Sequence, residues 1–169
     1  LDLMCGIVGY IGSKEAYPIV LNGLKRLEYR GYDSAGIALY DGAMTHVCKT
    51  KGKVSSLAEK FSAQGVPEAQ IGIGHTRWAT HGVPNDVNSH PHVSNSGDLI
   101  LVHNGIIENY AALKTVLQQR GYVFHSDTDT EVLVNLIEEV KKTNKVKLGK
   151  AVQLALQEVE GEKFPYEDA

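Results

Sequence analysis

Apolar residues at helical spacing recur along the chain and predict its helices. One helix is expected to open at Pro18, with Val20, Leu24 and Leu27 on one face. Further helices are expected over 53–61, over 110–120 with Gly121 as its C-cap, from 128 onward, and over 148–159. Residues 128–131 read Thr-Asp-Thr-Glu, which is the spacing of a capping box and predicts a helix start there.

Apolar runs without that spacing predict strands. They are expected just after Cys5 and over 35–40, 44–49, 71–78, 98–103 and 122–125. Asp41-Gly42 lies between two of these runs and is a strong hairpin signal, whereas residues 27–36 break the period and are expected to form a loop. A second, longer polar stretch over 79–97 has no period, and loops of that length in a compact domain are often functional. Helices inserted between strands predict an α+β fold.

Composition sets limits on the class of protein. At 169 residues the chain is expected to form one domain with a substantial core. Its hydrophobic content of 43% and charged content of 22% are ordinary for a soluble globular protein. A net charge of -3 gives no reason to expect nucleic acid or an anionic membrane as partner, and no apolar run is long enough to span a bilayer. The two cysteines do not make a disulfide framework, so a reducing cytoplasm fits best.

Cys5 stands at the start of the first predicted strand, directly after Met4. If it were the first residue, its own α-amine, with a pKa of about 7.7–8.0, could act as general base for its thiol. A free cysteine thiol has a pKa of about 8.5, so the two groups are nearly matched for proton transfer. Alternatively, Cys5 is a small apolar residue that opens a buried strand. On this stretch alone both interpretations stay open.

Candidate binding groups follow at the ends of other predicted elements. Arg77 can bind a carboxylate through two hydrogen bonds, although a structural ion pair is the commoner use of such an arginine. Trp78, the only tryptophan, favours packing over ligand stacking. Asn104 and Gly105 can supply two donors to an oxyanion, but Asn-Gly is also a frequent turn. Asp129 can receive an ammonium group, or it can be an acid favoured by the helix dipole.

Five of the seven histidines lie between Ile73 and Asn104, namely His75, His81, His90, His92 and His103. Such a cluster raises the question of a metal site, yet the spacings fit no familiar zinc pattern. Hydrogen-bonded structural histidines are therefore the better interpretation, and no metal is expected.

Taken together, these stretches resemble the glutaminase domains of class II glutamine amidotransferases, which are N-terminal-nucleophile hydrolases, and in particular the glucosamine-6-phosphate synthase branch. The matching stretches come in the family's order and spacing over most of residues 4–161, and they are 5–9, 27–36, 75–82, 88–92, 103–109 and 128–131. The resemblance implies a four-layer αββα sandwich with Cys5 on a central strand. It also implies a domain over 5–161, preceded by an extension over 1–4 and followed by a tail over 162–169.

The resemblance also implies roles for individual residues. Cys5 would be the nucleophile and its amine the base, with Asn104 and Gly105 forming the oxyanion hole. Arg77 would hold the α-carboxylate of glutamine and Asp129 its α-amino group.

Four further residues would support this site: Trp78, Thr80 and His81 would help line the pocket, and Arg30 would lie near the nucleophile. No cofactor is implied. L-Glutamine would be hydrolysed through a thioester, and in the full-length protein, expected to be a homodimer, the ammonia would pass to a phosphosugar isomerase domain that aminates fructose 6-phosphate. That domain lies outside these 169 residues.

Two departures from the family pattern carry predictions of their own. While residues 1–4 precede Cys5, its nitrogen is an amide and no base, so such a chain is expected to be inactive or nearly so. Residues 162–169 are polar where the family continues into an apolar strand. Three other hypotheses stay open: an amidotransferase acting on phosphoribosyl pyrophosphate or aspartate, a non-catalytic module that senses glutamine, and a histidine metal module.

Overall fold

The computed structural model describes residues 5–78 and 83–161. The chain divides into two compact units. The first comprises residues up to 92 together with 100–104, and the second comprises 93–99 and the residues from 105 onward. The extension over 1–4, the tail over 162–169, and the predicted pocket residues Thr80 and His81 lie outside the described residues.

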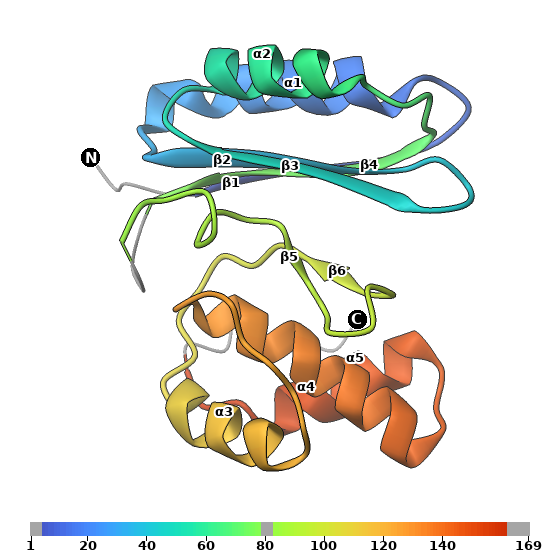
Figure 1. Ribbon diagram of the computed structural model, residues 1–169, viewed down its shortest axis with the longest axis vertical. Coiled ribbons are helices and arrows are strands. Elements are labelled where there is room, and N and C mark those ends of the chain that lie inside the picture. The colour runs from blue at the N-terminus through green and yellow to red at the C-terminus, as the bar shows by residue number, and fades with distance from the viewer. Residues whose placement is uncertain (1–4, 79–82, 162–169) are drawn as a thin grey trace, which may run out of the picture. The chain divides into compact units, whose positions relative to one another are not determined.

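A four-stranded antiparallel sheet forms the centre of the first unit, with two helices covering one of its faces (Figure 1). The strands in spatial order are β1 (Gly6–Ile11), β4 (Ile71–Arg77), β2 (Ser34–Tyr40) and β3 (Thr45–Lys51), and the helices are α1 (Ala16–Leu27) and α2 (Val54–Gln64). A 3-10 helix, η1 (Glu28–Arg30), connects α1 to the loop before β2.

The core of this unit lies between the sheet and its helices. Val20 and Leu24 of α1 are fully buried, as the spacing predicted, and they pack with Ile37 and Leu39 of β2. On β4, Gly74 lies directly under α1: an added Cβ would come within 2.6 Å of Val20 and 3.0 Å of Leu24. The glycine therefore brings the helix close to the strand, because a larger residue would force the two apart.

Gly36 on β2 meets the backbone of another segment even more closely. A Cβ there would overlap the carbonyl oxygen of His90, a backbone atom that no rotamer change can move away. We expect Gly36→Ala to lower the free energy of unfolding by about 3 kcal/mol, at the upper end of the usual cost of overpacking. Gly9→Ala on β1 is the matched control, since its Cβ would meet only Ile73 at 4.0 Å. Urea unfolding measures both, and equal midpoints for the two variants would contradict the expectation.

Residues 86 and 87 of the first unit, which follow the undescribed residues 79–82, are held by hydrogen bonds. Asp86 accepts hydrogen bonds from the backbone N–H of Lys51 at 2.8 Å and from Nζ of Lys60 at 2.6 Å. The ammonium of Lys60 lowers the pKa of the Asp86 carboxyl. Lys49 donates in turn to the carbonyl of Val87 at 3.1 Å. Residues 86 and 87 are thereby attached to β3 and α2.

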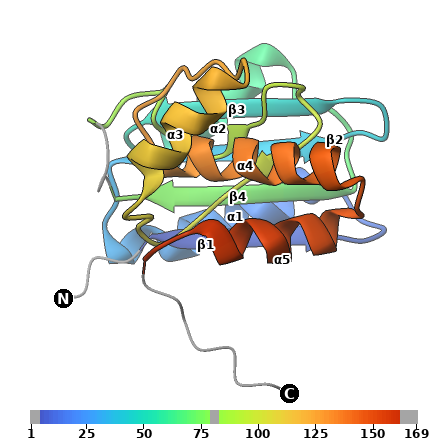
Figure 2. The same ribbon diagram turned by 90° about the horizontal axis from the view of Figure 1, so that it is seen from below.

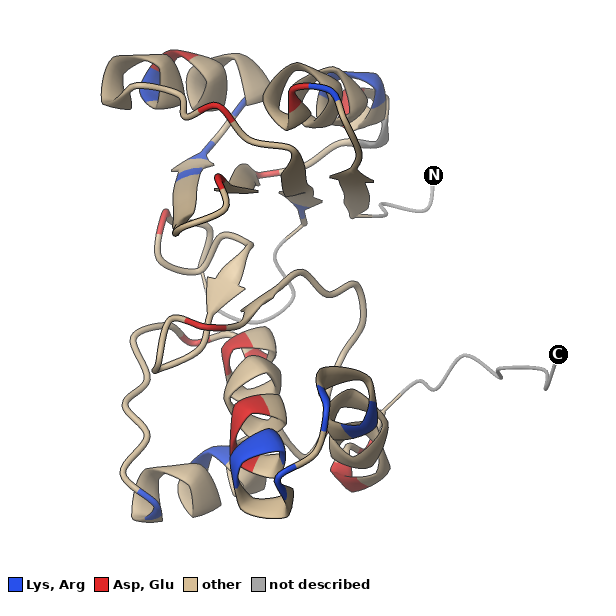
Figure 3. Ribbon diagram, turned by 90° about the vertical axis from the view of Figure 1, so that its right-hand side faces the viewer, with Lys and Arg blue, Asp and Glu red and all other residues tan. Residues whose placement is uncertain are grey.

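The second unit consists mainly of helices: α3 (Tyr110–Gln119), α4 (Asp129–Asn144) and α5 (Leu148–Glu158). Helices α4 and α5 lie side by side (Figure 2). Acidic and basic residues both occur along them (Figure 3), with acids in the first turn of α4 and Lys141 and Lys142 in its last turn, as the helix dipole favours. Outside these helices, two short strands, β5 (His92–Val93) and β6 (Ile100–Leu101), form a separate two-stranded sheet, and all of its residues except Val93 belong to the first unit.

The predicted capping box is confirmed in one half and replaced in the other. Thr128 caps α4 by accepting from the backbone N–H of Glu131 at 3.3 Å. The carboxylate of Glu131 does not reach back to Thr128; it accepts from the backbone N–H groups of His125 at 2.9 Å and Ser126 at 2.7 Å. This buried carboxylate therefore holds the segment that leads into the helix.

Several other sequence-based predictions are confirmed, and four are wrong in detail. Cys5 was expected on a central strand, but it precedes β1, which lies at the edge of the described sheet. The α+β class, the Asp41-Gly42 hairpin between β2 and β3, and the five helices are confirmed. The strand expected over 98–103 is reduced to the two residues of β6, and the loop expected over 27–36 contains η1 and the start of β2. No strand forms over 122–125, because side chains accept the backbone N–H groups there. Asn95 accepts from Val123 N–H at 2.8 Å, and Glu131 accepts from His125 N–H. Among the described residues, no helix is long and apolar enough to cross a membrane.

Candidate active site

Cys5 lies immediately before β1, at the end of the sheet where β4 finishes. The antiparallel register pairs Gly6 with Thr76, and the Gly6 N–H donates to the Thr76 hydroxyl at 3.1 Å. This register brings Cys5 next to the residues that follow β4, and the backbone N–H of Trp78 donates to Cys5 Sγ at 3.1 Å. The thiol sulfur lies 3.7 Å from the carbonyl oxygen of the same residue. The sulfur is thus held by the backbone of one neighbouring residue.

The environment of Cys5 favours the neutral thiol. Burial raises the pKa of the Cys5 thiol, and the hydrogen bond from Trp78 N–H and the positive charge of Arg77 only partly offset that effect. Asp33 acts in the same direction as burial, because its negative charge disfavours a thiolate. A nucleophilic Cys5 would therefore need a base to accept its proton.

Arg77 is the last residue of β4 and is 3% exposed. Its carbonyl accepts from the backbone N–H of Asp33 at 2.9 Å, so the loop before β2 is fixed beside it. Arg77 lies close enough to Cys5 for its charge to act on the thiol. The structure thus places a buried cation beside the sulfur.

Asn104 is joined to Cys5 through its side-chain amide. Its Nδ2 donates to the backbone carbonyl of Cys5 at 3.0 Å, and its Oδ1 lies 2.7 Å from Nε2 of His75. An amide held at both its nitrogen and its oxygen has a fixed orientation. In the first unit, the structure therefore brings Cys5, Arg77, Trp78 and Asn104 together.

Asp129 and Gly105 belong to the second unit. Asp129 is the first residue of α4, is 4% exposed, and accepts from the backbone N–H of Ile107 at 2.9 Å. A carboxylate at this position also benefits from the positive end of the helix dipole. Because Ile107 follows Gly105 by two residues, the carboxylate of Asp129 holds the segment that carries the predicted glycine donor.

The remaining candidates are less fully described. Trp78 has 40% of its surface exposed. Arg30 ends η1, but its side chain lies outside the part of the chain that the structure describes, as do Thr80 and His81.

Four of the clustered histidines, His75, His90, His92 and His103, lie in the first unit, and the rings of the first three pack on one another. The rings of His75 and His90 stack with centroids 4.2 Å apart, and His90 meets His92 edge-on at 4.8 Å. The backbone N–H of His103 donates to Nδ1 of His90 at 3.4 Å. Burial is the main reason that the pKa of His75 falls to about 4 and that of His92 to about 3. These rings are consequently neutral at pH 7.

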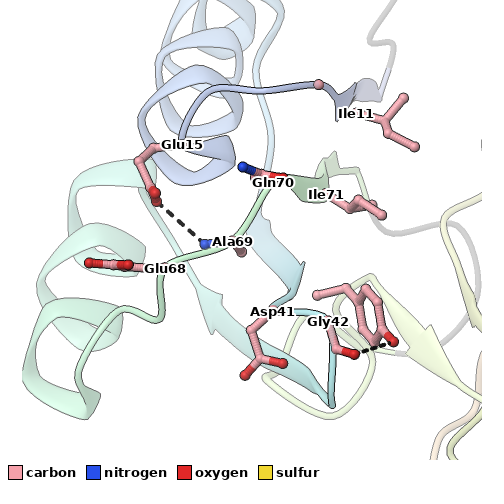
Figure 4. Close-up of a pocket in the computed structure, with 10 residues that line it drawn as sticks. Ile11, Glu15, Asp41, Gly42, Glu68, Ala69, Gln70 and Ile71 are labelled. Carbon is pink, nitrogen blue, oxygen red and sulfur yellow. Dashed lines mark hydrogen bonds between the residues drawn. The ribbon is translucent and has the colours of Figure 1, made fainter.

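A hollow in the first unit lies away from Cys5. It is lined by Glu15, Asp41 and Glu68 together with residues at the end of β1 and the start of β4 (Figure 4). The six residues of β1 separate it from Cys5, which corresponds to about 20 Å. Two of its acids already serve the fold: Glu15 accepts from Ala69 N–H at 3.4 Å, and Asp41 accepts from Ala43 and Met44 N–H, both at 2.8 Å. The hollow is therefore separate from the cysteine-centred site.

Sequence reasoning missed two residues that position this site. Thr76 holds the strand that carries Cys5, and His75 holds Asn104. Both belong to the matching stretch 75–82, but alternation along β4 could have indicated only His75. Residues 72 and 74 face α1, so His75 and Arg77 share the opposite face of the strand.

The fold and the comparison with solved structures define the class of protein. The chain is similar to the glutamine phosphoribosylpyrophosphate amidotransferase of B. subtilis, with 31% identity and a TM-score of 0.76 over 92% of this chain and 33% of the other. It is also similar to an allosteric regulatory enzyme of purine biosynthesis, with 30% identity and a TM-score of 0.78 over the same shares. These similarities confirm the predicted α+β sandwich of the N-terminal-nucleophile hydrolase type.

Within that class, residues 61–155 match the glutamine amidotransferase domain family, and the chain belongs to this family. Among curated proteins, it is 65% identical over 159 residues to the glutamine–fructose-6-phosphate aminotransferase (isomerising) of Bacteroides thetaiotaomicron. It is 58% identical over 161 residues to that of Chlorobaculum tepidum. In both cases 94% of this chain is covered, but only 26% of the relative. The chain thus spans about a quarter of the length of these relatives.

Proposed function

We propose that this chain is the glutaminase domain of a glutamine–fructose-6-phosphate aminotransferase. It would hydrolyse L-glutamine to glutamate and ammonia at Cys5. The observation that carries the proposal is the arrangement around Cys5. The backbone nitrogen of Trp78 lies 3.1 Å from the Cys5 sulfur, and the side-chain nitrogen of Asn104 lies 3.0 Å from the Cys5 carbonyl oxygen. A nucleophile and an oriented N–H donor are the two groups that acyl transfer requires.

The reaction begins with attack of Cys5 Sγ on the side-chain amide carbon of glutamine. The thiol proton passes to the α-amine of Cys5, which is free in a chain that begins at this residue. The negative charge that develops on the amide oxygen is stabilised by the side chain of Asn104 and the backbone N–H of Gly105. The amine then gives its proton to the departing nitrogen, and ammonia leaves behind a glutamyl thioester.

Water completes the cycle. The amine of Cys5 takes a proton from water as the oxygen attacks the thioester carbon, the C–S bond breaks, and the sulfur regains a proton. Glutamate is released.

Substrate recognition would use the opposite charges of Arg77 and Asp129. The guanidinium of Arg77 would bind the α-carboxylate of glutamine through two hydrogen bonds, and the carboxylate of Asp129 would bind the α-ammonium. Trp78, Thr80 and His81 would line the pocket, and Arg30 would support the loop beside the nucleophile. The glutaminase domain would extend over 5–161, with 1–4 as an extension or an unprocessed leader and 162–169 as a tail.

The test is release of ammonia from glutamine by a chain that begins at Cys5. Cys5→Ala is expected to abolish release completely, since no other described group is placed to form the thioester. Arg77→Lys retains the charge but loses the planar two-bond contact, so it is expected to raise KM about tenfold or more with a smaller effect on kcat. A glutamine-sensing module would instead bind glutamine without releasing ammonia, and that result would contradict the proposal.

The sugar specificity rests on the sequence relatives. Identity of 65% to an aminotransferase exceeds the 31% identity to a phosphoribosylpyrophosphate amidotransferase, and this difference favours fructose 6-phosphate as the acceptor of ammonia. In a longer protein like those relatives, a phosphosugar isomerase domain would receive the ammonia and form glucosamine 6-phosphate. Formation of phosphoribosylamine rather than glucosamine 6-phosphate would contradict this assignment of the acceptor.

We further propose that this protein is a cytoplasmic homodimer.

A further inference from the structure

His75 and Asn104 form one end of a chain of hydrogen bonds that finishes at Cys5. The carbonyl of Cys5 can only accept, so Nδ2 of Asn104 must donate to it at 3.0 Å. Oδ1 of Asn104 can likewise only accept, so Nε2 of His75, 2.7 Å away, must carry a hydrogen. The direction of each contact follows from the chemistry of its partner.

This chain requires one tautomer of His75. A neutral imidazole carries a single N–H, and here it must be on Nε2. The opposite tautomer would place a lone pair of the ring against a lone pair of Oδ1 and would release the amide of Asn104. Burial keeps the ring neutral, because the pKa of His75 is about 4.

The ring itself is held in place by its neighbours. His75 is 1% exposed, and it stacks on His90 with an interplanar angle of 16°. His90 in turn packs edge-on against His92. The imidazole of His75 is therefore fixed by the neighbouring histidine rings, and it cannot move with Asn104 if the amide rotates.

We propose that His75 is a positioning residue for glutamine hydrolysis, which donates Nε2–H to Asn104 and so turns the amide N–H of Asn104 toward the developing oxyanion. The contact to Cys5 uses one of the two hydrogens on Nδ2, and the other remains for the substrate oxygen. This inference rests on the proposed function and adds to it a residue that does not touch the substrate.

Two near-isosteric substitutions test the role of the donor, in a chain that begins at Cys5. Gln places an N–H close to the position of Nε2, whereas Asn places one close to Nδ1. Loss of an oxyanion donor costs about 10²–10³ in kcat, and misorientation of that donor should cost part of this. We expect His75→Asn to lower kcat by about ten- to a hundredfold with KM changed less than about threefold, and His75→Gln to retain most of kcat.

A double-mutant cycle separates positioning from general damage to the fold. If His75 acts through Asn104, His75→Asn should have little further effect on kcat in an Asn104→Ala background. Equal losses in both backgrounds would overturn the inference. Alkylation of Cys5 by iodoacetamide forms no oxyanion, so its rate should stay within about twofold in His75→Asn.

Nitrogen NMR of the unsubstituted protein gives a readout independent of activity and of any variant's folding. Long-range proton–nitrogen correlations should show the hydrogen of His75 on Nε2; a hydrogen on Nδ1 would overturn the inference even if the enzyme is active. Absence of glutamine hydrolysis by the unsubstituted chain would overturn the proposed function together with this inference. Activity that is equally high in His75→Asn would overturn the inference alone.

Discussion

A chain that begins at Cys5 should hydrolyse glutamine at least about a hundred times faster than the same chain with residues 1–4 retained. The amine of a first residue can accept the thiol proton, whereas the nitrogen of an amide cannot. General base catalysis contributes about 10²–10⁴ to rate. The need for a base is particularly strong here, because burial raises the pKa of the Cys5 thiol and so lowers the fraction of thiolate at neutral pH.

The comparison is best made within one preparation. A protease site placed directly before Cys5 allows ammonia release to be followed before and after cleavage, with intact mass reporting the extent of processing. A matched control carries the same site and Cys5→Ala, and it should gain no activity on cleavage. The midpoint of thermal unfolding should change little, because cleavage frees the amine without altering the core.

The dependence of the rate on pH identifies the base. Only the unprotonated amine accepts a proton, so kcat/KM of the processed chain should rise with pH through about 7.7–8.0, the range of an α-amine. The unprocessed chain has no such group at Cys5. Equal rates before and after cleavage would mean that another group serves as the base. The proposal that the α-amine of Cys5 activates its own thiol would then be wrong.

Periodicity and local chemistry predicted the elements better than they predicted how the elements are joined. The spacing of Val20 and Leu24 placed α1 correctly, because a buried helical face requires that spacing wherever the partner lies. The expected strand over 122–125 failed because the side chains of Asn95 and Glu131 take the backbone N–H groups that a neighbouring strand would have used. No local pattern reveals a partner 28 residues away in sequence.

The same limit applies to the site. Arg77 and Asn104 were predicted as candidates because arginine and asparagine at strand ends suit carboxylate and oxyanion binding. The roles of His75 and Thr76 depend on contacts across 29 and 70 residues, which arise only from the antiparallel register of the sheet and the return of the chain at 104. The histidines were interpreted from spacing alone, which could not show that three of their rings pack on one another.

Those rings should make the protein sensitive to mild acid. Burial lowers the pKa of His75 to about 4 and that of His92 to about 3, and it holds the pKa of His90 well below its usual range. In the unfolded chain each histidine takes up a proton near pH 6.5. Between pH 6.5 and about 4 the unfolded state thus binds more protons, so the stability that is complete above pH 6.5 is lost as the pH falls.

The size of this loss is large relative to ordinary stability. His75 and His92 each cost up to about 1.4 kcal/mol per pH unit within this window, or about 2 kcal/mol between pH 6.5 and 4.5. His75 and His92 together thus approach the lower end of the roughly 5–15 kcal/mol that stabilises a typical domain. We therefore expect the midpoint of urea unfolding to fall steeply over this range, which ends near the ordinary pKa of carboxyl groups, so that acids contribute little to the slope.

Matched variants assign the slope to the buried rings. His92→Gln removes one of them and should flatten the dependence of unfolding free energy on pH by up to about 1.4 kcal/mol per unit. His125→Gln removes an exposed imidazole and serves as the matched control, and equal flattening in both variants would contradict the assignment to the buried rings. A midpoint that stays constant down to pH 4.5 would show that the buried rings accept protons as readily as free histidine. In that event, a neutral His75 ring could no longer explain how Nε2–H stays directed at Asn104.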